Sequence, residues 1–214
     1  MSILRVFLYA LTTALATGLG ALPFAFARDL TRRWLGASNA LAAGLMLAAS
    51  FGLLYEGVDH GLSGTLAGAA AGLAFIVLVR KLLQGDEHPA VFAGMSNMDA
   101  RKALLVVGVM TMPSFTEGVA VGVAFGGGAG LGLFIALAIA VHNVPEGLAI
   151  SLVLVPRGVS WGRAAFWSVF SSVPQPLMAV PAFAFVETFR SLLPYGLGFA
   201  AGPHDLDGLL RARP

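Results

Sequence analysis

Long apolar runs alternate with short polar stretches along most of the chain. Six of these runs reach the roughly 20 residues that an α-helix needs to cross the hydrocarbon core of a bilayer: about 3–27, 36–58, 62–83, 102–125, 130–155 and 164–187. A seventh run begins near Leu192 and stops at Pro203, where polar residues follow. The pattern therefore predicts an all-α, polytopic transmembrane helix bundle with six full spanning helices and a partial seventh. We expect residues 1–202 to form the transmembrane domain and 203–214 a polar C-terminal tail.

Composition supports this interpretation. Of the 214 residues, 57% are hydrophobic and 11% are charged, whereas soluble domains carry roughly 25% charged residues. The formal net charge of +2 does not indicate a nucleic-acid-binding protein, because the cations stand at the ends of apolar runs and form no patch. The chain contains no cysteine, which excludes disulfides and thiolate metal ligands. We expect a lipid bilayer as its surroundings.

Lysine and arginine are distributed unequally between the predicted loops. The loops after the first, third and fifth helices carry nine of them: Arg28, Arg32, Arg33, Arg80, Lys81, Arg101, Lys102, Arg157 and Arg163. The alternate loops carry only Arg190. Because cytoplasmic loops are enriched in cations, the odd-numbered loops should be cytoplasmic and the N-terminus outside.

Ionisable residues interrupt the fifth apolar run in the string His142-Asn143-Val144-Pro145-Glu146-Gly147. A helix places His142 and Glu146 on one face, one turn apart, and Asn143 can reach the same side. Imidazole, amide oxygen and carboxylate together suit a divalent transition metal. Pro145 leaves a backbone carbonyl without its helical partner and bends the helix. The pattern indicates a metal-binding step at mid-membrane depth, and the alternative is a hydrogen-bonded polar cluster that fixes helix packing.

A related string occurs in the fourth run. Residues 113–120 match 142–149 at an offset of 29, with Glu117 opposite Glu146 and a glycine and an alanine coinciding. The glycine-rich connection 125–130 is short, so the two runs should be antiparallel neighbours, and the two glutamates could face one site. The alternative for Glu117 is a protonated carboxyl packed in the bundle.

Other polar residues admit weaker interpretations. Glu56, Asp59 and His60 stand at the outer end of the second predicted helix, where they form either an entrance for cations or an ordinary interfacial cluster. The loop 84–100 contains Asp86, Glu87 and His88. That loop is either solvated or a weak metal-collecting segment.

On these strings the chain resembles the ZIP (Zrt/Irt-like) divalent metal transporter family, nearest to its GufA-like branch. The His-Asn-Val-Pro-Glu-Gly string resembles the family's metal motif, and residues 171–178 resemble the family's next helix. The resemblance implies that His142, Asn143 and Glu146 are metal ligands and that Gln175 borders the metal path, the alternative being a helix–helix hydrogen bond. It also implies that Met46 occupies the position at which the family's second helix supplies a thioether near the metal. The alternative is a methionine that packs in the core.

The chain also departs from the family's pattern at several positions. The first motif copy has Pro113 where the family usually has His and Thr116 where it usually has Pro, while Glu117 is retained. Ser114 is acceptable in the GufA-like branch, where it is either a ligand or water anchor or a residue with only a structural role. Losing an imidazole leaves an oxygen-richer site, which should weaken zinc preference relative to manganese or iron. The family has eight helices with both termini outside, so the chain resembles a relative truncated at its C-terminus.

The resemblance implies transport of divalent cations into the cytosol, with zinc first and iron, manganese and cadmium as further cargoes. The alternative is a truncated, non-transporting relative that binds metal in the membrane or acts as a sensor. An intramembrane metalloprotease is disfavoured because the chain has no His-Glu-x-x-His string, so we expect no enzyme. A proton-coupled carrier of small solutes is a further alternative. The expected location is a bacterial inner membrane. A homodimer is possible, and the sequence does not decide the oligomeric state.

Overall fold

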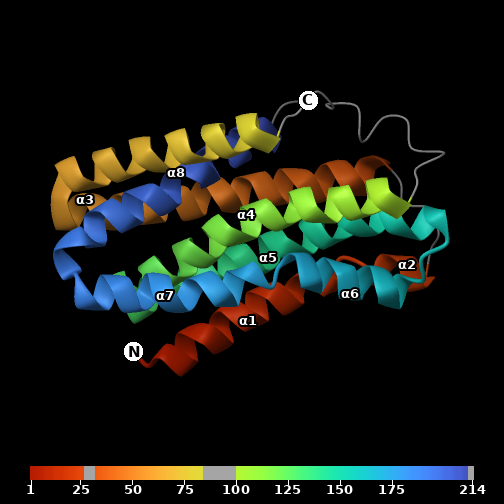
Figure 1. The fold of residues 1–214 in the computed structure, drawn as a ribbon, viewed down its shortest axis with the longest axis horizontal. Coiled ribbons are helices and arrows are strands. Elements are labelled where there is room, and N and C mark those ends of the chain that lie inside the picture. The colour runs from red at the N-terminus through yellow and green to blue at the C-terminus, as the bar shows by residue number, and fades with distance from the viewer. Residues whose placement is uncertain (27–31, 84–99, 212–214) are drawn as a thin grey trace.

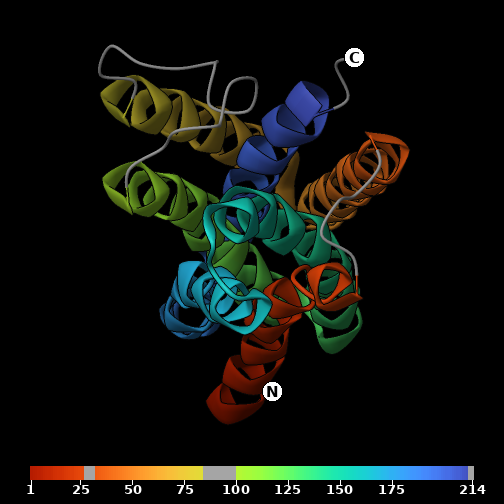
Figure 2. The same ribbon diagram turned by 90° about the vertical axis from the view of Figure 1, so that its right-hand side faces the viewer.

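The computed structural model describes residues 1–26, 32–83 and 100–211, which form helices with no β-strand among them. The expected all-α class is therefore confirmed. The elements in chain order are α1 (Ile3–Leu19), α2 (Pro23–Phe26), α3 (Arg32–Leu83), α4 (Ala100–Gly127), α5 (Ala129–Leu154), η2 (Val155–Arg157), α6 (Trp161–Ser171), α7 (Pro174–Thr188), η3 (Arg190–Leu192) and α8 (Leu193–Arg211). The long helices follow the long axis of the molecule (Figure 1) and form a bundle when viewed from one end (Figure 2).

Helix α3 contains the second and third predicted helices, folded back on one another. Its backbone leaves helical geometry at Gly61 (φ 158°, ψ 107°), within the connection that the sequence predicts. Helix α8 lies between the two arms, 32–60 and 62–83 (Figure 2). Ser50 Oγ of the first arm donates a hydrogen bond to the carbonyl oxygen of Ala201 (3.2 Å). A Cβ added to Gly68 in the second arm would overlap the carbonyl oxygen of Tyr195, so this arm and α8 meet backbone to backbone.

Helices α4 and α5 are antiparallel neighbours, as the short glycine-rich connection predicts. The chain reverses at Gly128, whose φ of 153° separates the two helices. Next to this turn the helices pack closely, because a Cβ added to Gly132 would overlap the ring of Phe125. The two copies of the motif therefore lie on helices that are in contact.

Helix α1 packs along α5. A Cβ added to Gly147 would overlap the carbonyl oxygen of Thr17, and one added to Gly20 would overlap the backbone of Leu148. The expected first helix extends to residue 27, but α1 ends at Leu19 and the short α2 follows. Gly20 disfavours continuation of a helix, and Pro23 lacks the N–H that a continuing helix would use and instead begins α2.

The sixth predicted helix, 164–187, is divided into α6 and α7. Pro174 and Pro176 have no N–H, so the i→i−4 hydrogen bonds that would join the two helices cannot form. Pro174 instead occupies the first position of α7, which its fixed φ favours. The two helices still follow one line across the bundle (Figure 1).

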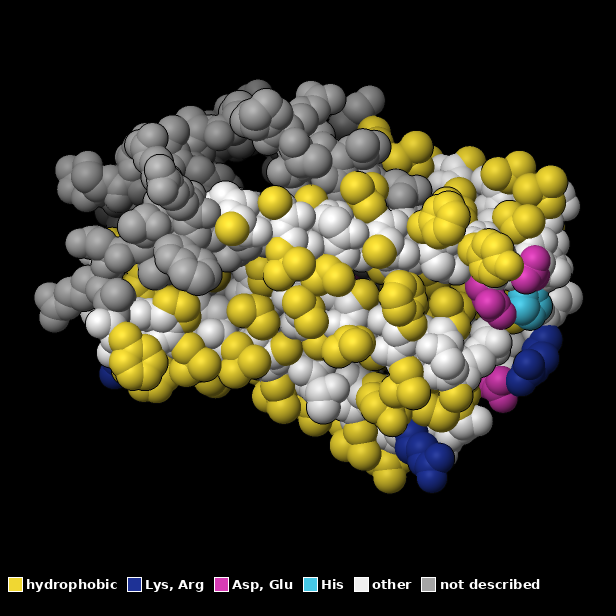
Figure 3. All heavy atoms as spheres, turned by 180° about the vertical axis from the view of Figure 1, so that it is seen from behind, with side chains coloured by type: hydrophobic (Ala, Val, Ile, Leu, Met, Phe, Trp, Pro, Cys, Tyr) yellow, Lys and Arg dark blue, Asp and Glu magenta, His cyan; other side chains and the backbone are white. Residues whose placement is uncertain are grey.

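Many large hydrophobic side chains of the described residues are exposed, as a bilayer allows. Yellow side chains are spread over the described part of the face in Figure 3, and most of the charged side chains drawn there lie towards one end. Among the described residues, three segments are long and apolar enough to cross a membrane: Ile3–Phe26, Ala129–Leu154 and Trp161–Thr188. The chain is therefore an integral membrane protein by helix length and composition, while six full spans stay a prediction.

Helix α8 does not end where the apolar run ends. It continues as far as Arg211, so the backbone stays helical past the end of the apolar run, while the division at residue 202 between transmembrane domain and polar tail stays a prediction. Polar residues such as His204 and Asp205 oppose burial in lipid, but they do not prevent helix formation.

Candidate metal centre

Helix α5 supplies three of the predicted site residues. His142, Asn143 and Glu146 are 1%, 0% and 0% exposed, because their face of α5 turns towards the interior of the bundle. Pro145 lies inside α5 between them, where it withholds one backbone hydrogen bond from the preceding turn. The chain thus buries an imidazole, an amide and a carboxyl within about one turn of helix.

Helix α4 supplies the matching carboxyl. Glu117 is 0% exposed and stands four residues after Pro113, which is also inside its helix. Thr116 Oγ1 donates to the carbonyl oxygen of Pro113 (2.8 Å), so the hydroxyl is occupied by its own helix. Gly118 allows α7 to approach, because a Cβ there would lie 2.5 Å from the carbonyl oxygen of Gln175.

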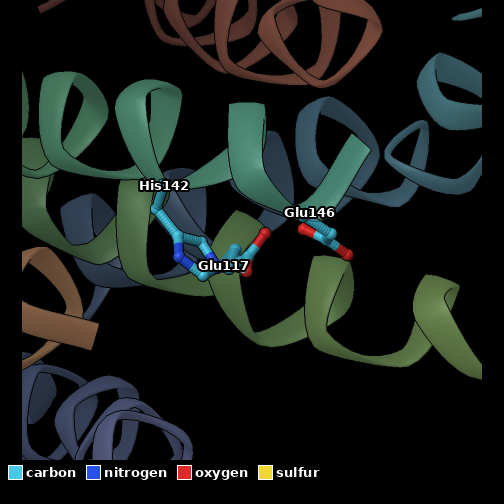
Figure 4. A group of neighbouring side chains, drawn as sticks. All are labelled: Glu117, His142 and Glu146. Atoms are coloured by element: carbon cyan, nitrogen blue, oxygen red, sulfur yellow. Dashed lines mark ion pairs between the residues drawn. The ribbon is translucent and has the colours of Figure 1, made fainter. Parts of the chain in front are cut away.

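The two helices bring their ionisable groups together. His142 Nε2 lies 3.5 Å from Glu117 Oε1. Each of Glu117, His142 and Glu146 offers one ligand atom within 4.8 Å of the others. Figure 4 shows the imidazole of His142 beside the carboxyl of Glu117, with Glu146 further along α5 and its carboxyl on the α4 side. The antiparallel pairing predicted from the short connection therefore places both glutamates of the repeat in one group.

This group has the chemistry of a divalent cation site. Zinc binds nitrogen and carboxylate oxygen tetrahedrally at about 2.0–2.2 Å, so two ligands of one ion lie about 3.3–3.6 Å apart. The separations observed here require only small side-chain movements to reach those values. Two carboxyl groups buried in a membrane-embedded bundle are costly to ionise without a compensating positive charge, which a bound cation supplies.

Amide groups connect this cluster to α7. Gln175, 0% exposed, donates from Nε2 to Glu117 Oε2 (2.5 Å). Its Oε1 accepts a hydrogen bond from Asn143 Nδ2 (3.0 Å). Gln175 therefore lies at the site, as its predicted position bordering the path implies, and it also forms the helix–helix hydrogen bonds of the alternative interpretation.

Thr13 of α1 is a member of this network that the sequence analysis missed. Its hydroxyl donates to Gln175 Oε1 (2.6 Å), and its carbonyl oxygen accepts from Asn143 Nδ2 (2.7 Å). The available signal was weak: Thr13 and Thr17 stand four residues apart on one face of α1, and both are buried. The hydroxyl of Thr17 lies 2.7 Å from that of Ser172.

Ser114 and Met46 lie close to the group. Ser114, 0% exposed, is one turn before Glu117 on α4, and its Oγ has no hydrogen-bond partner among the described residues. Met46, 3% exposed, lines a small pocket together with His142. Both positions agree with the predicted neighbourhood, while their roles as ligands stay predictions.

Of the two further predicted clusters, one lies apart from this group and the other falls on residues that the structure does not describe. Glu56, Asp59 and His60 stand at the bend of α3, and His60 Nδ1 lies 3.9 Å from Glu56 Oε1 and 2.9 Å from the carbonyl oxygen of Glu56. They do not join the buried group found among the described residues. Asp86, Glu87 and His88 lie outside the described residues.

Comparison with known proteins gives a family and several relatives. A family model described as ZIP zinc transporter matches residues 84–202, more than half of the chain. Zinc transporter GufA of Myxococcus xanthus is 35% identical over 205 residues, which cover 90% of this chain and 81% of GufA. Zinc transporter ZIPB of Bordetella bronchiseptica is 35% identical over 201 residues, covering 87% of this chain and 64% of ZIPB.

A plant relative is more similar in sequence but much longer. The Arabidopsis thaliana protein named "Putative zinc transporter At3g08650" is 48% identical over 206 residues. The match covers 94% of this chain and 33% of the plant protein. The chain thus spans about a third of the length of this relative.

Proposed function

The chain belongs to the ZIP zinc transporter family, and from that premise we propose that it carries divalent metal cations across its membrane through the group formed by Glu117, His142 and Glu146. Members of the family are transporters, which confirms the expectation that the chain is no enzyme. The observation that carries the proposal is the burial of two carboxyl groups and one imidazole within 4.8 Å of one another, contributed by two apolar helices. Ionisable side chains at membrane depth are costly, so they mark a functional site by default.

The cargo we propose is zinc first, with iron, manganese and cadmium as further ions. The support is the ligand set. One imidazole and several oxygen groups fit zinc, and the oxygen-rich composition also suits the harder ions. Pro113 occupies the position at which an imidazole would complete the set, so zinc should be held less selectively than by a site with two imidazoles.

Import towards the cytosol is the direction we propose, with the N-terminus outside and a bacterial inner membrane as the location. The cation-rich loops support this orientation. Glu56, Asp59 and His60 belong to the same end of the bundle as the α4–α5 turn, because a Cβ on Gly127 would lie 3.7 Å from Glu56 Cγ. Acidic groups at this end would attract cations from outside.

Release inwards requires that the helices move, and the packing suggests which of them move together. Glycines bring backbones into contact within two sets: α8 meets the second arm of α3 at Gly68, and α5 meets α1 at Gly147. Where the sets meet one another, a glycine faces a side chain instead, as Gly52 faces Phe134. Rocking of α3 and α8 against the remaining helices would open the site, as in other transporters with a midplane site.

Uptake of radioactive zinc into proteoliposomes tests this proposal. Wild type should show saturable uptake, and His142→Ala/Glu146→Ala should lose it while still inserting. Val141→Ala is the matched control, because Val141 precedes His142 on α5 but is 36% exposed. Equal uptake by the double variant and wild type would refute the proposed site.

A second candidate function is a membrane protein that binds metal, as a sensor or as a partner of an intact transporter, without moving it. Pro113 in the first motif copy is the observation that favours it, because the missing imidazole leaves fewer ligands to receive the ion. Zinc binding by wild type without uptake in the same liposomes would support this candidate.

A further inference from the structure

Thr13 lies outside both motif helices, yet it contacts both amides of the site. Its one hydroxyl proton is shared between Gln175 Oε1 (2.6 Å) and the carbonyl oxygen of Ala10 one turn earlier on α1 (2.7 Å). Its own carbonyl oxygen accepts from Asn143 Nδ2 (2.7 Å). The side chain is 1% exposed, so water does not compete for these hydrogen bonds. Helix α1 is therefore joined to the site on α4 and α5 by a buried polar network.

The carbonyl of Thr13 determines how the Asn143 amide is turned. A backbone carbonyl can only accept a hydrogen bond, so the NH₂ group of Asn143 must face it. The second N–H of that group donates to Gln175 Oε1 (3.0 Å). Asn143 Oδ1 is consequently turned away from α1 and α7, and it is buried with no hydrogen-bond partner in the part of the chain that the structure describes.

The same reasoning fixes Gln175. Its Oε1 accepts from Thr13 Oγ1 and from Asn143 Nδ2, which leaves Nε2 to donate to Glu117 Oε2. If this amide were reversed, Nε2 would face the NH₂ of Asn143 and Oε1 would face a carboxyl oxygen. The first contact sets two donors against each other whatever the protonation of Glu117, so the observed orientation is preferred.

We propose that Thr13 is a positioning residue, which fixes the orientation of the Asn143 and Gln175 amides. Asn143 then presents Oδ1 to the ion, and Gln175 holds Glu117 through the hydrogen bond to its Oε2. The inference rests on the proposed function, since it concerns ligands of the transported ion. It assigns Gln175 to orienting Glu117 and Asn143 rather than to binding the ion. Groups that orient metal ligands typically contribute about 10–100-fold to metal affinity.

Thr13→Val removes the hydroxyl while keeping the shape of the side chain. A methyl group would then stand where the hydroxyl oxygen now lies, 2.6 Å from Gln175 Oε1. Carbon and oxygen need about 3.3 Å or more, so the amide must move away. Thr13→Ser keeps the hydroxyl. Thr12→Val is a matched control, because Thr12 donates to the carbonyl of Tyr9 (2.6 Å) as Thr13 does to the carbonyl of Ala10, but Thr12 is exposed.

Equilibrium zinc binding to the purified 214-residue chain, measured by competition with a chromophoric chelator, tests the proposal. Thr13→Val should weaken binding by about 10-fold, with Thr13→Ser and Thr12→Val close to wild type. In a Gln175→Leu background the further effect of Thr13→Val should largely vanish, because the two residues act through one interaction. Unchanged binding in Thr13→Val would overturn the proposal, and so would an equal effect in the Gln175→Leu background.

The proposed transport function and the proposed role of Thr13 can be refuted separately. Zinc uptake by wild-type proteoliposomes is measured beside the binding. Binding without uptake contradicts transport and leaves the role of Thr13 standing, while uptake with normal binding by Thr13→Val contradicts Thr13 alone. A wild-type chain that binds no zinc contradicts both.

Discussion

At the scale of single residues, the exchange at Pro113 has the clearest chemical consequence. The second motif copy carries His142 at the equivalent position, four residues before its glutamate. Pro113 therefore leaves the group with one imidazole and two carboxyl groups. Thr116, where a proline stands in the other copy, is 5% exposed and bonds to the carbonyl of Pro113.

Exchanging these two residues should complete the site. Pro113→His with Thr116→Pro adds an imidazole one turn before Glu117, on the same face of α4. We expect zinc to bind about 10-fold tighter or more and to gain relative to manganese, because imidazole favours zinc. The measurement is competition binding with both metals. Pro113→Ala with Thr116→Pro is the control, since it moves the proline without adding a ligand, and an equal gain there would contradict the argument.

Protons should compete with the metal at this site. A metal binds neutral imidazole and ionised carboxylate, so binding releases protons and weakens as the pH falls. Zinc uptake should therefore decrease from about pH 8 to about pH 5, when vesicles are assayed with equal internal and external pH. A rate that is flat across this range would count against coordination by His142 and the two glutamates.

Much of the buried group is predictable from the sequence. The spacing of His142 and Glu146 sets them on one helix face, and the repeat at Glu117 brings a second carboxyl when the helices pair. Gln175 is predictable only as a neighbour of the path. Thr13 is not predictable in this way, because its contacts join α1 to α5 and α7, and no local spacing encodes a tertiary contact.

At the scale of elements, glycines determine how closely the helices approach. In α5, Gly147 meets the backbone of α1 at Thr17, and in α4 Gly118 meets α7 at Gln175. Small residues at such contacts let membrane helices gain packing and interhelical hydrogen bonds. The network around Thr13 depends on this approach, because its hydrogen bonds span α1, α5 and α7.

Gly147→Ala should therefore be destabilising. The added methyl group would overlap the carbonyl of Thr17, and overpacking of this kind costs about 1–3 kcal/mol. Gly130→Ala in the same helix is the control, because a Cβ there meets nothing within 4 Å. Thermal unfolding in detergent, followed by tryptophan fluorescence, should show a lower midpoint for Gly147→Ala only. Equal midpoints would show that α1 can move away from α5 without cost.

The apolar runs predict most helix positions but not the breaks within them. Runs 102–125 and 130–155 correspond closely to α4 and α5. The division between α6 and α7 follows from Pro174 and Pro176, whose missing N–H groups are invisible to hydropathy. At α8 the apolar run is shorter than the helix. Polar residues end the run at Pro203, whereas the helix continues to Arg211.

At the scale of the whole molecule, the ends of the bundle are chemically distinct. The N-terminal half of α1 belongs to the end that holds the α4–α5 turn, because Tyr9 stacks on Phe125 with ring centroids 5.2 Å apart. Glu56 lies at the same end, beside Gly127. The loop cations predict which end faces the cytoplasm, whereas the contacts that gather these segments needed the structure.

Labelling of single cysteines tests the orientation. The chain contains no cysteine, so Ser2→Cys and Ser160→Cys each introduce one exposed thiol on opposite sides of the predicted membrane. In intact cells of a Gram-negative host with a permeable outer membrane, an impermeant maleimide should label Ser2→Cys, and it should label Ser160→Cys only after lysis. The reverse pattern would contradict an N-terminus outside.

X-ray absorption at the zinc edge tests the central claim, that the buried group holds the ion, most directly. With one equivalent of zinc bound, the account predicts a single imidazole with oxygen ligands at about 2.0–2.2 Å. The imidazole signal should disappear in His142→Ala and persist in His60→Ala, which alters the exposed histidine at the bend of α3. An imidazole signal that persists in His142→Ala, or disappears in His60→Ala, would contradict the account.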